Sequence, residues 1–393
     1  YLLFGILPGK TDIVSGKVDV VLPVDKTGKM EFGAKSSFVR NDNDAPYRTW
    51  DWNAGKEKDD PRSDHFIYEE NINAAYANFS QQQNKWSYQL GLRLEHTHSV
   101  GNSLATAKRV PRDYAQLFPT AFFNYKVNEK NTLGLSYSRR IVRPSYPDLN
   151  PFQRILDTFT YQQGNPYLTP QFSHNIELSH NFGGVVNTVL NYTRTDDIIN
   201  DILKQVGTTT FQTKENVASS RNIGLAVSIN VPVKKWWFLN TYVNVYNNQF
   251  NGVISGEPLD VNMTAWMANM SQQFRTGKGW TLELSGFYRS TTQDAGIIVA
   301  NPMGVVNFGV SKTILKNMGT LKLNVNDPFY IQKFSGYTRF HDINTDISSK
   351  WDNRRVALSF TWRFSKGQNA PQQRKRSSSA QDEQSRVGGG GQQ

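Results

Sequence analysis

The chain has 393 residues, a formal net charge of +11 and no cysteine, and charged residues make up only 20% of it. Its 9 Trp, 17 Tyr and 23 Phe are too many for a disordered chain, whereas its mean hydropathy of −0.56 is too low for a bundle of membrane helices. Lysine and arginine are scattered singly rather than gathered in one stripe, which argues against a nucleic-acid partner, and the absence of cysteine excludes disulfides and thiol chemistry.

The dominant pattern is an alternation of apolar and polar residues with a period of two, which predicts half-buried β-strands. In chain order, clear cases lie at 86–95, 222–231 and 356–364. In the first of these, alternate leucines place Arg93 and Glu95 on the opposite face. The sequence contains no run of 18 apolar residues, which excludes a spanning helix but not a membrane barrel, because barrel strands alternate lipid-facing and lumen-facing residues.

This alternation assigns side chains to two faces. The predicted lipid-facing residues are Leu90, Leu92, Leu94, Leu225, Val227, Leu282, Leu284, Leu358 and Phe360. The predicted lumen-facing residues are Arg93, Glu95, Ser228, Asn230, Glu283 and Arg363.

Two classes of connection join the predicted strands. Short polar turns are expected at 26–29, 82–84, 128–130, 182–184, 233–235, 276–278 and 316–318. Longer connections are expected at 41–64, 97–113 and 141–169. Short turns at one end and long loops at the other are typical of an outer-membrane barrel, with the turns periplasmic and the loops extracellular. The hairpin unit recurs every roughly 40 to 55 residues, which predicts about fifteen strands after residue 13.

Tryptophans follow three of the short turns, at Trp86, at Trp236 and Trp237, and at Trp280. An indole at that place would anchor at the lipid headgroups, whereas in a soluble protein each would close the end of a core. The recurrence favours the membrane girdle. Beyond Phe364 the alternation stops, and residues 365–393 are rich in Gln, Ser, Arg and Gly, which predicts a disordered periplasmic tail.

With the hairpins laid out, the chain resembles the outer-membrane β-barrel family that forms the C-terminal barrels of TonB-dependent receptors. The resemblance runs from about residue 13 to Phe364 and is strongest at Leu133–Arg140, Arg143–Pro144, Leu149–Phe152 and Gly164–Pro170. The aromatic-ended last strand is also similar to the signal that the barrel-assembly machinery reads.

This resemblance implies an all-β fold, a transmembrane antiparallel β-barrel of about 22 strands of which about 15 are present. It also implies an N-terminal plug domain that contacts TonB, which is not visible in this chain. We therefore expect residues 1–364 to be the C-terminal portion of the barrel, in contact with outer-membrane lipid.

The proline-rich stretch from Arg143 to Pro170 predicts a rigid, ordered loop. Its aromatic residues Phe152, Phe159, Tyr161 and Tyr167 are candidates for ligand contact in an extracellular loop. The alternative is a structural loop folded over the barrel mouth, and the sequence favours this alternative.

Metal and enzyme motifs are weak. His96 and His98 share a strand face without a third ligand, and Asp196, Asp197 and Asp201 lack the spacing of a calcium loop, so solvated polar clusters are the favoured interpretation. No carboxylate pair, nucleophile elbow or metalloprotease helix appears in the sequence. The sequence predicts no enzyme, no cofactor and no metal site.

The favoured function is therefore that of the barrel portion of a TonB-dependent receptor in the bacterial outer membrane, which takes up a ligand that the sequence does not identify. Two alternatives stay open. One is a self-contained passive porin that closes with roughly 14 to 16 strands. The other is a structural or assembly barrel that binds envelope proteins.

Overall fold

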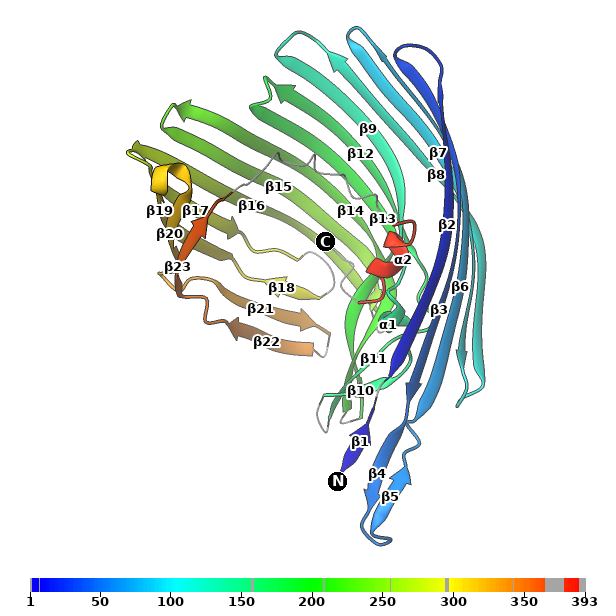
Figure 1. The fold of residues 1–393 in the computed structure, drawn as a ribbon. Helices are drawn as coiled ribbons and strands as arrows, with labels where there is room; N and C mark the ends of the chain where they lie inside the picture. Colours follow the sequence, from blue (N-terminus) through cyan, green and yellow to red (C-terminus); the bar gives the residue numbers. More distant parts are fainter. Residues whose placement is uncertain are drawn as a thin grey trace.

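The computed structural model describes residues 2–6, 8–156, 159–207, 209–254, 256–293, 297–341, 343–364 and 378–388. One 17-stranded sheet dominates it and curves into an open trough (Figure 1). Two short strands of this sheet, β10 (Gln153–Ile155) and β11 (Thr160–Gln163), belong to a loop, and the other fifteen form the wall. The predicted antiparallel fold and the number of strands are thus confirmed.

Each wall strand pairs antiparallel with the next along the chain. The wall strands are β2 (Gly9–Pro23), β3 (Gly28–Ala45), β6 (Asp64–Gln83), β7 (Trp86–Ser103), β8 (Lys108–Lys126), β9 (Asn131–Val142), β12 (Gln171–Phe182), β13 (Val186–Val206), β14 (Thr209–Lys234), β15 (Trp237–Ile254), β16 (Glu257–Gly277), β17 (Trp280–Arg289), β19 (Met303–Ile314), β20 (Gly319–Asn326) and β23 (Arg355–Trp362).

The wall does not close on itself. Strand β2 pairs with β3 and strand β23 pairs with β20, and within the described residues neither outer strand has a second neighbour. Figure 1 shows these two strands, dark blue and orange, on opposite sides of the trough. Each therefore presents a row of unpaired backbone groups, which a bilayer does not tolerate unless further strands cover them.

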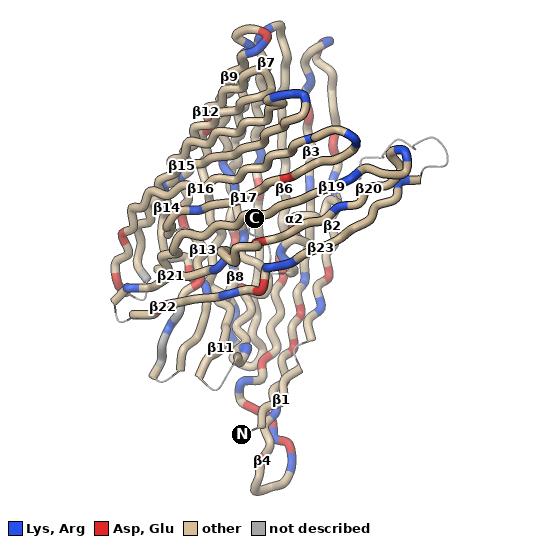
Figure 2. The backbone as a smooth tube through the Cα atoms, turned by 90° about the vertical axis from the view of Figure 1, so that its left-hand side faces the viewer, with Lys and Arg blue, Asp and Glu red and all other residues tan. Residues whose placement is uncertain are grey.

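All seven predicted short turns lie between consecutive wall strands and at the same end of the wall, and the one after β19 contains the 3-10 turn η1 (Leu315–Asn317). Figure 2 shows Lys and Arg at several of these turns and few charges along the middle of the strands nearest the viewer. The predicted long loop at 97–113 is wrong, because β7 and β8 continue through it and leave only residues 104–107 as their connection. This stretch is rich in polar residues, so the sequence pattern did not show that β7 and β8 extend past the apolar part of the wall.

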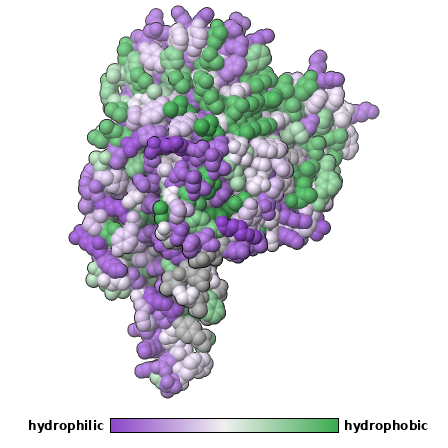
Figure 3. Space-filling model, turned by 180° about the vertical axis from the view of Figure 1, so that it is seen from behind, coloured by the Kyte–Doolittle hydropathy of each residue, from purple (hydrophilic) through white to green (hydrophobic). Residues whose placement is uncertain are grey.

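The predicted alternation of faces is confirmed along β7, where exposed and buried side chains alternate. Seven of the nine residues predicted to face lipid are exposed on the outside, and Val227 and Leu284 are half-buried there. Across the sheet, Glu283 pairs with Lys322 and Glu95 is buried. In Figure 3, apolar side chains gather over the upper half of the visible face, with hydrophilic ones below them.

Smaller elements lie beyond or inside the wall. At the long-loop end, β1 (Leu3–Gly5), β4 (Tyr47–Asp51) and β5 (Lys56–Asp59) form a three-stranded sheet, and β18 (Ile298–Ala300), β21 (Lys333–Phe340) and β22 (Ile343–Lys350) form another. Two short helices, α1 (Tyr146–Leu149) and α2 (Gln381–Ser385), lie on the concave side of the wall (Figure 1). Among the described residues, no helix has the length and apolar character needed to cross a bilayer.

The position of α2 corrects the expectation of a disordered tail for residues 378–388. This part of the chain forms a turn and a helix against the inner wall, because its charged side chains find buried partners there. Residues 365–377 and 389–393, which complete the predicted tail, lie outside the described residues.

Candidate functional site

The long loop between β9 and β12, residues 143–170, folds inward and packs against the inner wall. Three of its side chains, Tyr146, Leu149 and Leu168, are each 1% exposed. They form one apolar cluster with Val39 and Ile199 of the wall and with two wall aromatics, Phe66 and Tyr68. Burial of several large side chains makes this loop a fixed part of the interior.

Local chemistry explains why the loop takes this shape. Ser145 caps α1 by accepting a hydrogen bond from the backbone N–H of Asp148, and Pro147 lies in the first turn, where its missing N–H costs nothing. Gly164 passes so close to α1 that a Cβ atom there would lie 2.3 Å from the carbonyl oxygen of Asn150. Only glycine permits this approach, which holds the two halves of the loop together.

A charge network links the start of this loop to the wall. The guanidinium of Arg143 donates to Glu95 Oε2 at 2.6 Å and to Thr97 Oγ1 at 3.0 Å. The other oxygen of Glu95 accepts from Arg93 Nε at 2.5 Å. Glu95 therefore joins two arginines, one on its own strand and one on the loop. Because each carboxylate oxygen accepts a hydrogen bond from an arginine, the desolvation cost of burying this charge is offset.

Two further ion pairs connect the C-terminal segment, residues 378–388, to the wall. Lys35 Nζ lies 2.9 Å from Glu383 Oε1, which also accepts from Ser37 Oγ at 2.7 Å. Arg386 Nη1 lies 2.5 Å from Glu70 Oε2. All four of these charged residues have side chains no more than 11% exposed.

Electrostatics favours the ionised form of both segment residues. Burial alone would raise the pKa of Glu383, but the hydrogen bonds from Ser37 and Lys35 outweigh it and hold that pKa below its ordinary value. Burial alone would lower the pKa of Arg386, but the neighbouring Glu70 carboxylate outweighs it and raises that pKa. The segment is therefore held by charges that stay ionised at neutral pH.

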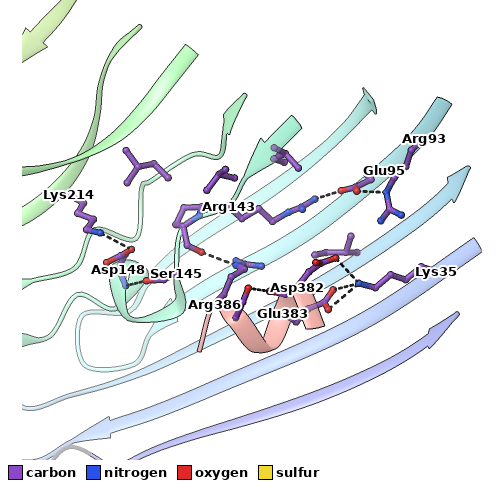
Figure 4. Close-up of a pocket in the computed structure, with 16 residues that line it drawn as sticks. Lys35, Arg93, Glu95, Arg143, Ser145, Asp148, Lys214, Asp382, Glu383 and Arg386 are labelled. Carbon is purple, nitrogen blue, oxygen red and sulfur yellow. Dashed lines mark hydrogen bonds and ion pairs between the residues drawn. The ribbon is translucent and has the colours of Figure 1, made fainter. Parts of the chain in front are cut away.

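These groups surround a cavity of about 320 Å³ on the concave side (Figure 4). The wall contributes Lys35, Arg93, Glu95 and Lys214, the long loop contributes Arg143 and Asp148, and α2 contributes Asp382 and Glu383, with Arg386 just beyond it. One buried polar atom of the lining, Arg143 Nε, has no hydrogen-bond partner among the described residues. The cavity is thus strongly charged, and its charges are mostly paired with one another.

A second cavity, of about 530 Å³, lies beside the same loop nearer its outer end. Two of the predicted contact residues, Phe152 and Tyr167, line it together with Phe66 and Phe211. Tyr167 is 61% exposed, whereas Phe152 is half-buried against the apolar cluster. Aromatic rings and the charged groups of Lys204 and Glu215 therefore meet in one hollow.

The other two predicted contact residues lie elsewhere. Tyr161 stacks on Phe211, with ring centroids 5.2 Å apart, where β11 pairs with β14. Phe159 is exposed and does not line either cavity. The structure thus brings Phe152 and Tyr167 together in one cavity. Tyr161 does not line this cavity but stacks on Phe211, which does.

Sequence reasoning missed the ion pairs of Glu70 and Arg386 and those of Lys35 and Glu383. The alternation had placed Arg93 and Glu95 on the inner face, but no pattern linked them to Arg143, which is 48 residues away from Glu95. The one available signal for α2 was the spacing of Glu383 and Arg386, which are neighbours on a helix.

The weak metal candidates gain no support. His96 and His98 lie on the outer face, where both contact the carboxylate of Asp113 at about 3 Å. Arg194 pairs with Asp196. Among the described residues, no group of three or more potential ligands is arranged to hold a metal ion.

Comparison with known proteins identifies a β-barrel family, in agreement with the curved antiparallel wall. The model of the "Outer membrane protein beta-barrel family" matches residues 5–362. No curated protein matches the sequence.

Three solved structures resemble the fold. The ferric yersiniabactin uptake receptor FyuA from Yersinia pestis has a TM-score of 0.64 at 14% identity, covering 92% of this chain and 55% of that one. The copper transporter OprC has a TM-score of 0.67 at 10% identity, with 91% and 57% covered. The siderophore receptor PiuA from Acinetobacter baumannii has a TM-score of 0.63 at 13% identity, with 91% and 56% covered. This chain spans little more than half the length of each.

Proposed function

Because this chain belongs to the outer membrane protein beta-barrel family, we propose that it is the larger part of the wall of a TonB-dependent receptor that takes up a ligand across the bacterial outer membrane. The open wall carries this proposal. Fifteen strands with two unpaired edges suit a portion of a larger barrel, and the outer-membrane transporters with plugged lumens have about 22 strands. The similar structures, an uptake receptor, a copper transporter and a siderophore receptor, support the same function.

A self-contained porin would need β2 to pair with β23, so that no strand edge met lipid. Within the described residues these two strands do not pair. The porin is for this reason the weaker candidate. No specific observation favours a purely structural or assembly barrel.

The receptor function fixes an orientation and a set of partners. The short turns and the end of β23 would face the periplasm, and the long loops would face outward. A plug domain that contacts TonB would occupy the complete barrel, and the barrel-assembly machinery would insert it. Residues 1–364 would then be the barrel unit and residues 365–393 a separate segment that begins on the periplasmic side.

The ligand would first meet the second cavity, which is lined by aromatic rings and is called the aromatic cavity from here on. Phe152 and Tyr167 offer ring faces, and Lys204 and Glu215 offer charge at the same place. Since the similar structures are named for ferric yersiniabactin, copper and a siderophore, a metal complex is the first ligand class to test. Such a complex presents both the apolar and the polar groups that this lining would contact.

The uptake experiment compares cells that express the protein from its own gene with cells that lack the gene, supplied with radioactive iron bound to a panel of siderophores. Accumulation that requires the gene, TonB and the proton-motive force is expected. Entry of small solutes without TonB would identify a porin, and capture of envelope proteins without any uptake would identify a structural barrel.

A second experiment examines the open wall directly. Residues 1–393 are expressed behind a secretion signal, and outer membranes are examined for a heat-modifiable, protease-resistant band. We expect no folded band, because the bare edges would lie in hydrocarbon. A folded band with ion conductance in planar bilayers would overturn the proposal.

A further inference from the structure

The C-terminal segment is specifically seated on the inner wall rather than merely near it. Its first contact is between Ser379 Oγ and Ser15 Oγ, which are 2.6 Å apart. Ser15 pairs across strands with Ser37, and Ser37 donates to Glu383. The segment thus follows a single level of the wall, near the middle of β2 and β3.

Its other end is fixed to the long loop. The backbone carbonyl of Arg386 accepts from Tyr146 N–H at 3.1 Å, and Arg386 Nε donates to the carbonyl oxygen of Pro144 at 3.0 Å. The guanidinium lies 4.4 Å from the centre of the Tyr146 ring. Since Glu70 holds the same guanidinium from the wall, Nε, both Nη atoms and one face of the guanidinium have partners.

The forces that hold the segment differ from those that hold a core. Of its described apolar residues, Ala380 is buried but small, and Val387 is 39% exposed. Nearly all specific contacts involve charged or hydroxyl groups. Buried ion pairs largely repay their own desolvation, and both wall partners, Lys35 and Glu70, would regain water if the segment left. The net free energy of docking is therefore small, and departure is feasible.

From these contacts we infer that the inner wall of β2, β3 and β6, together with the start of the long loop, is a docking site for the chain's own C-terminal segment. The segment binds there reversibly, with Glu383 on Lys35 and Arg386 on Glu70. When docked it supplies one side of the charged cavity, and when released it opens that cavity and exposes two unpaired wall charges. The C-terminal segment thus acts as a movable part of the lumen.

Disulfide trapping tests the docking, and these 393 residues contain no cysteine that would compete. Ser15→Cys combined with Ser379→Cys places two sulfur atoms where the hydroxyl oxygens now touch, within reach of a bond of roughly 2 Å. The protein is expressed from its own gene, and outer membranes are treated with a mild oxidant. We expect most of the folded protein to form the intramolecular link.

The matched control combines Ser379→Cys with Ser87→Cys. Ser87 is also on the wall, but it lies on β7 ten residues before Thr97, at the level of the short turns and roughly 33 Å along the strand from the docking level. We expect at least tenfold less linkage. Equal linkage in both pairs, or none in the first pair while the barrel remains heat-modifiable, would overturn the inference.

Charge reversal tests the contacts themselves, using the Ser15→Cys and Ser379→Cys background. Lys35→Glu is expected to lower linkage about tenfold, because it faces Glu383 with a like charge. Adding Glu383→Lys should restore it, which a general loss of folding would not allow. Unchanged linkage in the Lys35→Glu variant, or failure of the double reversal to restore it, would overturn the proposed pairing. These readouts do not depend on uptake, so they remain valid if the receptor function is wrong.

Discussion

Two segments lie inside the wall, and different forces hold them there. The long loop buries Tyr146, Leu149 and Leu168 in an apolar cluster, whereas the C-terminal segment is held mainly by Glu383 and Arg386. Apolar burial stabilises in proportion to the area removed from water, but a buried ion pair gains little beyond its desolvation cost. The difference indicates a fixed loop and a movable segment within one lumen.

The contacts between the two segments impose an order on their release. Tyr146 and Pro144 of the loop contact Arg386, so loss of the loop's packing should free the C-terminal segment as well. Loss of the segment should leave the loop in place, because the apolar cluster contains none of its residues.

The largest effect is expected for Leu149→Ala. It leaves a cavity in the apolar cluster and should destabilise the docked loop by about 2–5 kcal/mol. Trypsin should then cleave at Arg154, and the Ser15–Ser379 disulfide variant should lose its linkage. Leu156→Ala, in the same loop but 51% exposed, is the matched control and should cost less than about 0.5 kcal/mol. A protected Arg154 in the Leu149→Ala variant would contradict the idea of a fixed, apolar anchor.

A smaller and more local effect is expected for Arg386→Gln. Removing one partner of a buried pair leaves Glu70 without a counter-charge, and release of the segment relieves this by giving Glu70 access to water, so the net loss is smaller than for Leu149→Ala. A nitroxide on Gln384→Cys, an exposed position of α2, should become mobile in electron paramagnetic resonance spectra while Arg154 stays protected.

The control for this variant is Asp382→Asn, because the Asp382 side chain is 87% exposed and lies 3.5 Å from Lys35. With the nitroxide on Gln384→Cys, the spectrum of the Asp382→Asn variant should match that of the protein that carries Gln384→Cys alone. An immobile nitroxide in the Arg386→Gln variant would show that the ion pair to Glu70 does not hold the segment.

Acid should also release the segment, because protonation of Glu383 removes the charge that pairs with Lys35. The docked pKa of this carboxyl is below its ordinary value of 4.5, so its contribution is fully present above about pH 4.5 and is lost as the pH falls through the docked pKa. The nitroxide on Gln384→Cys should therefore stay immobile from pH 7 to pH 5 and become mobile in more acidic buffer.

The charged neighbours of Glu383 are Lys35 on the wall and Asp382 beside it. Glu383→Gln provides the comparison, because it removes the titrating group and should flatten the acid response. Release that begins near neutral pH would require a different titrating group.

Much of the wall could be predicted from sequence, since a period of two determines which face each side chain takes. The turns after Pro23 and Gly277 could be placed because polar and glycine-rich residues interrupt that period. The error at 97–113 has a physical cause. The strand period persists there, but His96, His98 and Asn102 take the outward positions that leucines take earlier in β7.

The interior could not be predicted in the same way. Glu70 with Arg386, and Lys35 with Glu383, are separated by more than three hundred residues, and nothing local in the sequence marks such partners. The composition of residues 365–393 predicts disorder because it offers no apolar area to bury. The segment at 378–388 is ordered instead by charges that only the folded wall brings to it.

The smallest effect on structure, and the most specific one on function, is expected at Tyr167. This ring lines the aromatic cavity yet is mostly exposed, so Tyr167→Ala removes a contact surface without leaving a cavity in the apolar cluster. Loss of one ring contact worth about 0.5–1.5 kcal/mol should weaken binding of a transported metal complex by roughly twofold to thirteenfold. The resistance of Arg154 to trypsin and the trapped disulfide should both stay unchanged.

Phe159→Ala is the matched control, because Phe159 is equally exposed on the same loop but does not line that cavity. Equilibrium binding to outer membranes, measured with the complex that the uptake assay identifies, separates the two variants. If both weaken binding equally, the ligand contacts the exposed loop in general. If only Tyr167→Ala does, the fixed loop presents the ligand site and the movable segment lies deeper along the same path.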